Sequence, residues 1–229
     1  DPRGARTRSQ ARRGKARTRA VSNENSNALF YLCANLLSCD DRVMKQLSMD
    51  ELEAGLDEIR RSPKENGVLM LIVRRPRARE RQVLDEGTLD LVQGLVGDSW
   101  STRPSSRTPD GSPHPDMQLN IINARVAALV AQHPDRWALA GDQLYIDMDL
   151  SAENLPAGTR LALGSAIVEV TAEPHTGCAQ FVSRFGVDAM KFVNSPVGRE
   201  LHLRGINARV VQPGVVQVGA AVRKIVTPG

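Results

Sequence analysis

The residues with the clearest chemical potential lie between Glu173 and Cys178, where the chain reads Glu-Pro-His-Thr-Gly-Cys. Cys178 follows a Gly-containing turn and precedes Ala179–Phe185, whose apolar pattern predicts a short helix. Free backbone N–H groups and the dipole at a helix start favour a cysteine thiolate, which is both nucleophile and metal ligand. Positive charge on His175 and Arg184 would favour it further. Cys178 and His175 are therefore the candidate catalytic residues; the alternative is that Cys178 is a buried, inert core residue.

Other familiar catalytic and metal-binding patterns are weak. Asp147, Asp149 and Glu153 are close in sequence, but acidic residues at alternate strand positions are more typical of a solvated face, and no calcium-loop spacing follows them. The sequence contains no Gly-rich phosphate loop and no Gly-x-Ser-x-Gly turn. A hydrolase built on Cys178 and His175 is disfavoured, because residues this close in sequence seldom align for proton transfer.

The basic charge of the chain is concentrated at its start. Of the 229 residues, 30 are Lys or Arg and 26 are Asp or Glu, yet residues 1–20 alone hold eight basic side chains and one acidic side chain. Residues 21–229 therefore hold 22 basic and 25 acidic side chains, a net charge of −3. We predict that residues 1–45 form a basic, low-complexity, disordered tail. Nucleic-acid binding by this tail is disfavoured, because no RNA- or DNA-binding motif accompanies it.

Cysteine content and hydropathy limit the class of protein. Cys33, Cys39 and Cys178 are too few and too widely spaced for a disulfide framework or a zinc finger. The longest apolar stretch, Ala28–Ser38, is shorter than the ~20 residues that a membrane-spanning helix needs, so we expect no membrane span. We expect a cytoplasmic protein. The alternative is export or organelle targeting, because the basic run, the apolar stretch and Cys39 loosely imitate a secretory signal.

Residues 46–90 are expected to form a helix and strands that pack on the body of the fold. Ser48 and Glu51 form a capping box, and the apolar residues that follow recur at helical spacing. Val68–Val73 is a short, dense apolar run, which favours a buried strand. Gln82–Leu84 is its expected antiparallel neighbour.

Residues 91–226 are expected to form one β-rich domain. It begins with a strand at Leu91–Val96, a long exposed loop at Ser99–Asp116, and a strand that runs into a helix at Leu119–Val130. The second half shows short alternating stretches and two helical patterns: strands at Tyr145–Leu150, Arg160–Leu163, Ala166–Val170, Leu201–Leu203, Ile206–Val210, Val215–Val218 and Val222–Ile225, and helices at Ala179–Phe185 and Asp188–Val193. Many short strands at nearly regular spacing favour a barrel or sandwich, so the fold class is mainly β with short helices.

Five segments of this domain follow one another in the order and spacing of MOSC domains, which are named for the C-terminal domain of molybdenum cofactor sulfurases. They are Gly94–Asp98, Gly141–Tyr145, Leu150–Leu155, Gly164–Val170 and Pro174–Cys178. The stretch from Asn207 to Gly214, leading to Gly219, also resembles the closing strands of that family. The resemblance covers Leu91–Ile225 and implies a MOSC-like β-barrel.

The resemblance also implies a chemistry for Cys178. In the family a single cysteine, whose position Cys178 matches, carries sulfur as a persulfide or ligates the metal of a pterin-bound molybdenum centre, and both roles need a thiolate. Some members reduce N-hydroxylated compounds. The implied cofactor is molybdopterin, and the implied partners are a small-molecule ligand and a sulfur donor or electron-transfer protein. Larger sulfurases carry a pyridoxal-phosphate domain, but the stretch before Leu91 is too short for one, so we expect no pyridoxal phosphate here.

Two departures from the family pattern bear on catalysis. Ala220 stands where many members have Asp after the closing Gly. The loop Ser99–Asp116 lacks the His-Gly-Gly pattern of some members and offers only His114. These departures weigh against a complete catalytic centre more than against a sulfur-carrier or binding role.

A molybdenum–pterin ligand is anionic, whereas the folded body has a net charge of −3, so local arginines must attract it. Arg184 is the first candidate because it lies six residues beyond Cys178. Arg125 and Arg209, from the repeated sequence Ile-Asn-Ala-Arg-Val, and Asn154, from the matched segment Leu150–Leu155, complete the cofactor-binding candidates. The alternative for the arginines is that they are solvated or paired with carboxylates. The alternative function is a non-catalytic β-barrel binding module in which Cys178 is structural.

Overall fold

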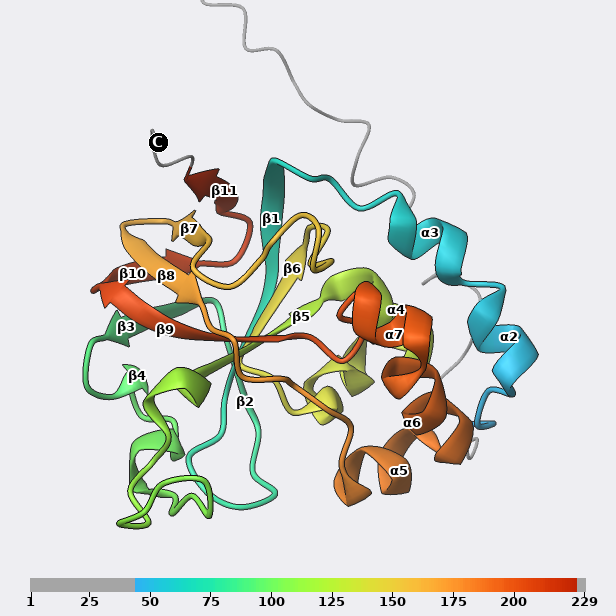
Figure 1. The fold of residues 1–229 in the computed structure, drawn as a ribbon, viewed down its shortest axis with the longest axis horizontal. Coiled ribbons are helices and arrows are strands. Elements are labelled where there is room, and N and C mark those ends of the chain that lie inside the picture. Colours follow the sequence, from blue (N-terminus) through green and yellow to red (C-terminus); the bar gives the residue numbers. More distant parts are fainter. Residues whose placement is uncertain (1–43, 226–229) are drawn as a thin grey trace, which may run out of the picture. The chain divides into compact units, whose positions relative to one another are not determined.

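The computed structural model describes residues 44–225, which are built around a closed β-barrel (Figure 1). Seven strands form it in the order β1, β11, β7, β8, β9, β5, β6, and β1 closes the ring by pairing with both β11 and β6. Their bounds are β1 Asn66–Arg74, β5 Leu119–Asn123, β6 Leu144–Asp147, β7 Arg160–Leu163, β8 Ala166–Val170, β9 Ile206–Gln212 and β11 Ala221–Ile225. Among these pairings only β5 with β6 is parallel. The predicted fold class is confirmed.

The segment before residue 91 contributes to the barrel itself, because β1 is one of its strands. β2 (Gln82–Leu84) extends the sheet as the antiparallel neighbour of β1, as predicted. A second, three-stranded sheet contains β10 (Gly214–Gln217), β3 (Glu86–Asp90) and β4 (Gly94–Leu95).

The predicted continuous strand at Leu91–Val96 is wrong. The Asp90 carboxylate accepts hydrogen bonds from the backbone N–H groups of Val92 (2.8 Å) and Gln93 (2.9 Å), which makes a turn between β3 and β4. Leu91 and Val92 are consequently exposed, whereas Leu95 on β4 is buried.

Alternation along the strands produces the barrel core. In β8, Ala166, Val168 and Val170 are buried, whereas Ile167 and Glu169 are partly exposed. Each strand adds such inward residues, and the resulting cluster includes Leu69, Ile72, Ile121, Leu144, Ile146, Leu161, Leu163, Ala208 and Val222. Removal of this apolar surface from water is the main stabilising contribution to the barrel.

The helices gather on one side of the barrel (right in Figure 1) around a second apolar cluster. They are α2 (Met49–Glu53), α3 (Leu56–Arg60), α4 (Ala124–Ala131), α5 (Ala179–Phe185), α6 (Val187–Asn194) and α7 (Pro196–Glu200), with the 3-10 helix η3 (Pro134–Ala140). Buried Leu52, Tyr145, Phe181 and Phe192 belong to this cluster. Because the segment that carries Cys178 leads from β8 into α5, the site lies where the barrel meets the helical side.

Several local expectations are resolved by these elements. The capping box of Ser48 and Glu51 is confirmed, but the helix that follows is broken into α2 and α3 at Ala54 and Gly55. The predicted strand at Leu201–Leu203 is wrong, because this stretch is the turn after α7. The predicted tail, with Cys33 and Cys39, lies outside the described residues apart from its last two positions. Within residues 44–225, no helix is long and apolar enough to cross a membrane.

Candidate functional site

Cys178 is exposed at the start of α5, where its backbone is extended (φ −125°, ψ 174°) and it occupies the N-cap position. Its carbonyl accepts hydrogen bonds from the N–H groups of Phe181 (2.9 Å) and Val182 (3.1 Å). The preceding Gly177 donates its N–H to the Asn194 side chain on α6 (3.2 Å), which ties the turn to the next helix. The thiol is therefore held on an ordered turn and is accessible to solvent, contrary to the alternative of a buried core cysteine.

His175 is buried against two charged side chains. Its side chain is 11% exposed, and its Nδ1 lies 3.5 Å from the Asp142 carboxylate without making a hydrogen bond. Desolvation, together with the positive charges of Arg204 and Arg75, lowers the pKa of His175 well below its ordinary value near 6.5. The imidazole is consequently neutral at neutral pH. The expectation that His175 adds positive charge near Cys178 is wrong, because burial removes that charge.

Asp142 and Arg204 form a buried ion pair behind this segment. Both Asp142 oxygens accept hydrogen bonds from Arg204 Nη1 at 2.9 Å, and Arg204 Nη2 donates to the Ala140 carbonyl at 3.1 Å. The Arg204 guanidinium also lies over the Phe181 ring of α5, 5.1 Å from its centroid. The pair thus connects the η3–β6 turn to the helix that follows Cys178.

Gly205 allows the chain to pass close to β5 and to His175. Its φ is +106°, and a side chain there would place Cβ 2.3 Å from the Ile121 carbonyl oxygen and 3.2 Å from His175 Nδ1. Glycine is therefore required on both conformational and steric grounds.

We predict a pH dependence of stability that belongs to His175. As pH falls below about 6.5, the unfolded chain binds a proton that the folded chain resists, so the free energy of unfolding falls by up to about 1.4 kcal/mol per pH unit until the lower folded pKa is reached. Above pH 6.5 the imidazole is neutral in both states and contributes no slope. Urea unfolding between pH 7.5 and 5 is expected to show this loss, which His175→Gln reduces and exposed His133→Gln leaves intact. Equal slopes in all three proteins would contradict the assignment.

Four arginines, which we call the arginine cluster, lie near the η3–β6 turn. They are Arg75 after β1, Arg81 before β2, Arg103 after the 3-10 helix η1 (Trp100–Thr102), and Arg184 in α5. The β1–β2 connection, the 99–116 loop (green) and α5 all lie along the lower edge of Figure 1. An ideal Cβ on Gly141 would be 3.6 Å from Arg81 Nη2 and 3.7 Å from Arg184 Nη1, so both guanidinium groups approach this glycine.

The arginine cluster has more positive charge than its carboxylate neutralises. Asp98 is fully buried and pairs with Arg75 (Nε to Oδ2, 2.9 Å), and Arg103 lies 3.8 Å from the same carboxylate. Arg184 donates only to the Leu139 carbonyl (2.5 Å). Arg81 donates Nη1 to the Glu80 carbonyl (2.6 Å), and its buried Nε has no partner. Burial, with repulsion from Arg184 and Arg75, lowers the pKa of Arg81. These conditions favour an anion beside Arg81 and Arg184.

Three of these arginines were missed by sequence reasoning. The stretch from Arg74 to Arg81 contains five arginines, which is a signal of a basic segment, but a charged run between two strands is also typical of a solvated connection. The sequence alone does not indicate that the β1–β2 connection packs near α5.

The other predicted cofactor-binding residues are engaged elsewhere. Arg125 pairs with Asp147 (2.7 Å) and Glu58 (2.7 Å), and Arg209 pairs with Glu169 (2.6 Å) and Asp116 (3.4 Å). Both arginines are therefore paired with carboxylates, which is the alternative to a cofactor-binding role stated above. Asn154 is also engaged and buried: its Nδ2 donates to the carbonyls of Lys64 (2.9 Å) and Asp149 (2.8 Å), and its Oδ1 accepts from Lys224 (3.3 Å). The structure brings only Arg184 onto the same helix as Cys178.

The closed barrel thus presents an exposed cysteine at the start of α5 and, on the same helix, one arginine of the arginine cluster. Residues 114–223 match the model of the MOSC domain family. The resemblance to the MOSC family is therefore confirmed over these residues.

Solved structures resemble the chain at low sequence identity. The YuaD protein of Bacillus subtilis is 18% identical, with 69% of this chain and 94% of that chain covered and a TM-score of 0.49. YiiM from Escherichia coli is 19% identical, with 71% of each chain covered and a TM-score of 0.46. YiiM from Geobacillus stearothermophilus is 13% identical, with 70% and 75% covered and a TM-score of 0.45. No curated protein matches the chain.

Proposed function

We propose that this MOSC-domain protein handles sulfur or binds a molybdenum–pterin cofactor through Cys178. The observation that supports it is the combination on α5: an exposed cysteine at its start and, six residues later, an arginine in a cluster of surplus positive charge. Six helical residues correspond to about 9 Å along the axis, which is the separation of the two residues along α5. The exposure of Cys178 favours this function over a binding module with a structural cysteine.

The described residues fit an anionic pterin group in their charge. Arg81 has a buried Nε without a partner, and Arg184 has no carboxylate partner among residues 44–225, so both are suited to hold phosphate or oxo oxygens. Cys178 would be the protein ligand to molybdenum, which supplies redox chemistry when bound. No group of three His, Cys, Asp or Glu side chains in the described part of the chain is arranged to hold a metal ion by itself. The proposal therefore concerns a metal that arrives on its pterin.

As a sulfur carrier, the protein needs only the Cys178 thiolate and a persulfide donor, without a bound cofactor. The Cys178 thiolate attacks the terminal sulfur of a donor persulfide, the donor's S–S bond breaks, and the donor leaves as a thiolate while Cys178 becomes the persulfide. No external oxidant is needed, because the transferred sulfur is already oxidised. We place this exchange in the cytoplasm, with a sulfur donor or an electron-transfer protein as partner.

The direct test measures what the purified protein carries. Protein from molybdenum-replete cells is expected to contain bound molybdenum, or, after incubation with a persulfide donor, one additional sulfur on Cys178 by mass spectrometry. If neither is found under either condition, the alternative of a non-catalytic β-barrel binding module is favoured.

The contribution of the arginine cluster gives a separate prediction. Arg184→Ala removes a charge-assisted donor and is expected to weaken molybdenum retention about tenfold or more, and Arg81→Ala should act similarly. Molybdenum per chain after gel filtration at rising salt measures the effect. Arg209→Ala is the matched control, because its guanidinium is exposed and paired elsewhere. Unchanged retention in both cluster variants would show that the arginines are merely solvated.

A further inference from the structure

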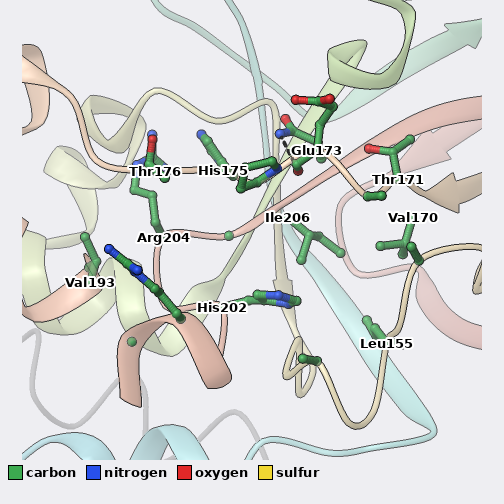
Figure 2. A pocket seen from close by; sticks show the side chains of 18 of the residues that line it. Leu155, Val170, Thr171, Glu173, His175, Thr176, Val193, His202, Arg204 and Ile206 are labelled. Carbon is green, nitrogen blue, oxygen red and sulfur yellow. Dashed lines mark hydrogen bonds between the residues drawn. The ribbon is translucent and has the colours of Figure 1, made fainter. Parts of the chain in front are cut away.

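A pocket of about 640 Å³ lies beside the segment that leads to Cys178 (Figure 2). Its walls come from residues 170–176, from the turn at 152–157 after β6, and from the α7–β9 connection. Cys178 does not line it. The pocket is therefore separate from the thiol, and its size is within the range of small-molecule sites.

The lining of the pocket combines apolar and polar side chains. In Figure 2, Leu155, Val170 and Ile206 lie near one another. Thr176 and Arg204 lie across the pocket from them, beside the apolar Val193. An apolar lining with a few polar groups is typical of sites that bind a small organic molecule.

Two buried polar atoms of pocket-lining residues have no partner. Arg204 is 6% exposed and uses both Nη groups in hydrogen bonds, yet its Nε–H makes none. His175 Nδ1 is also without a partner. Among the described residues, the only other buried side-chain nitrogen or oxygen without a hydrogen-bond partner is Arg81 Nε in the arginine cluster. Arg204 Nε and His175 Nδ1 are closed off from solvent and so do not face the cavity, and the ligand contacts therefore come from the exposed side chains of the lining.

The charges around the pocket favour an anionic ligand. Arg199 uses only Nε, which donates to the Asn194 carbonyl (3.1 Å), and it makes no ion pair with any residue in the described range. Glu173 is the pocket-lining carboxylate, and it is already occupied by Arg107 and lies 3.8 Å from His114. The unpaired positive charge of the lining is therefore the Arg199 guanidinium, and one guanidinium suits a ligand with a single negative charge.

His202 adds a hydrogen-bond acceptor. Its Nδ1 lies 2.7 Å from the Leu150 carbonyl oxygen, and in the tautomer that donates this hydrogen bond Nε2 is an acceptor. The residue adopts a left-handed backbone (φ +48°) in the turn after α7, and this turn directs the ring to the pocket.

We propose that this pocket binds a small organic monocarboxylate with an apolar body. Its carboxylate faces Arg199, and its body packs against Leu155, Val170 and Ile206. A polar substituent on the body can reach His202. This site is additional to the proposed chemistry of Cys178 and does not depend on it.

The test uses 3-phenylpropionate as probe and 3-phenylpropanamide as its uncharged counterpart, with the full chain in both titrations. Calorimetry is expected to give one binding site for the acid and about fivefold or weaker binding of the amide, because the amide lacks the charge-assisted contact. Amide chemical-shift changes on adding the acid are expected at residues 152–157 and 170–176.

Three variants locate the site. Ala152 is an exposed pocket-lining residue, so Ala152→Trp is expected to obstruct the pocket without unfolding the chain and to abolish binding. Arg199→Ala is expected to weaken the acid about fivefold and leave the amide unchanged. Arg160→Ala removes an exposed arginine of β7 and serves as the matched control.

Cys178→Ser separates this proposal from the proposed function, since it removes the thiol and is expected to leave binding of the acid unchanged. The proposal is overturned if the acid does not bind at millimolar concentration, or if Ala152→Trp and Arg199→Ala bind it as well as the unaltered chain. It is also overturned if the shift changes lie at Arg81 and Arg184, because the anion then occupies the arginine cluster.

Discussion

Replacing Arg204 with methionine is expected to lower the free energy of unfolding by about 3–5 kcal/mol, the range seen when one partner of a buried ion pair is removed. Asp142 is fully buried, and both of its oxygens depend on Arg204 Nη1. Methionine keeps much of the apolar contact with Phe181, so the loss reports the uncompensated carboxylate rather than a cavity. A domain of ordinary stability, about 5–15 kcal/mol, loses a large fraction of its total by this one change.

A second variant makes this prediction specific. Asp142→Leu combined with Arg204→Met removes both charges and is expected to recover much of the loss, because replacing a whole buried pair by apolar residues is often nearly neutral. Guanidinium unfolding at pH 7.5, where His175 is neutral, measures each variant. Arg209→Ala, at an exposed ion pair, is expected to cost less than about 1 kcal/mol. A loss below 1 kcal/mol for Arg204→Met would mean that Asp142 finds another partner or is protonated in the fold.

The strands of the second half were predictable because their signal is local. Arg160–Leu163 alternates, Ala166–Val170 is rich in β-branched residues, and a glycine turn separates them; the structure has β7 and β8 with these same bounds. α5 was also predictable from local signals, namely its apolar pattern and the glycine that follows it. Gly186 ends the helix with φ +93°.

The repeated pentapeptide shows where local patterns stop being informative. Ile122–Val126 spans the end of β5 and the first turn of α4, whereas Ile206–Val210 lies wholly within β9. Asn123 caps a helix by accepting a hydrogen bond from the Arg125 N–H, whereas the Asn207 side chain accepts from Asn120 (2.6 Å) inside the sheet. Identical side chains thus adopt different structures because their tertiary neighbours differ.

The candidate site was predictable in its cysteine and not in its electrostatics. Cys178 is marked by its own flanking residues, whereas the buried neutral state of His175 depends on Asp142 and Arg204, which are distant in sequence. The arginine cluster likewise joins four separate segments of the chain. Burial and charge pairing are properties of these long-range contacts, so no periodicity or spacing within one segment can show them.

The accessible thiol of Cys178 sets the largest expected functional effect. In the folded protein a thiol probe such as an iodoacetamide is expected to modify Cys178 without denaturant, because the residue is exposed on an ordered turn. Persulfide formation and molybdenum ligation both require this sulfur atom. Modification before loading is therefore expected to block both.

Cys178→Ser is expected to abolish persulfide formation and molybdenum retention altogether, since a serine oxygen replaces the only sulfur available at this position. The fold should be unaffected, because the side chain is exposed and serine is an effective helix N-cap, so the unfolding midpoint is expected to stay level or rise slightly. Mass spectrometry after persulfide treatment and metal analysis measure the loss, and Ser183→Ala on the exposed face of α5 is a matched control. If Cys178→Ser retains full molybdenum content, or if the native thiol reacts only after unfolding, Cys178 is structural and the binding-module alternative is correct.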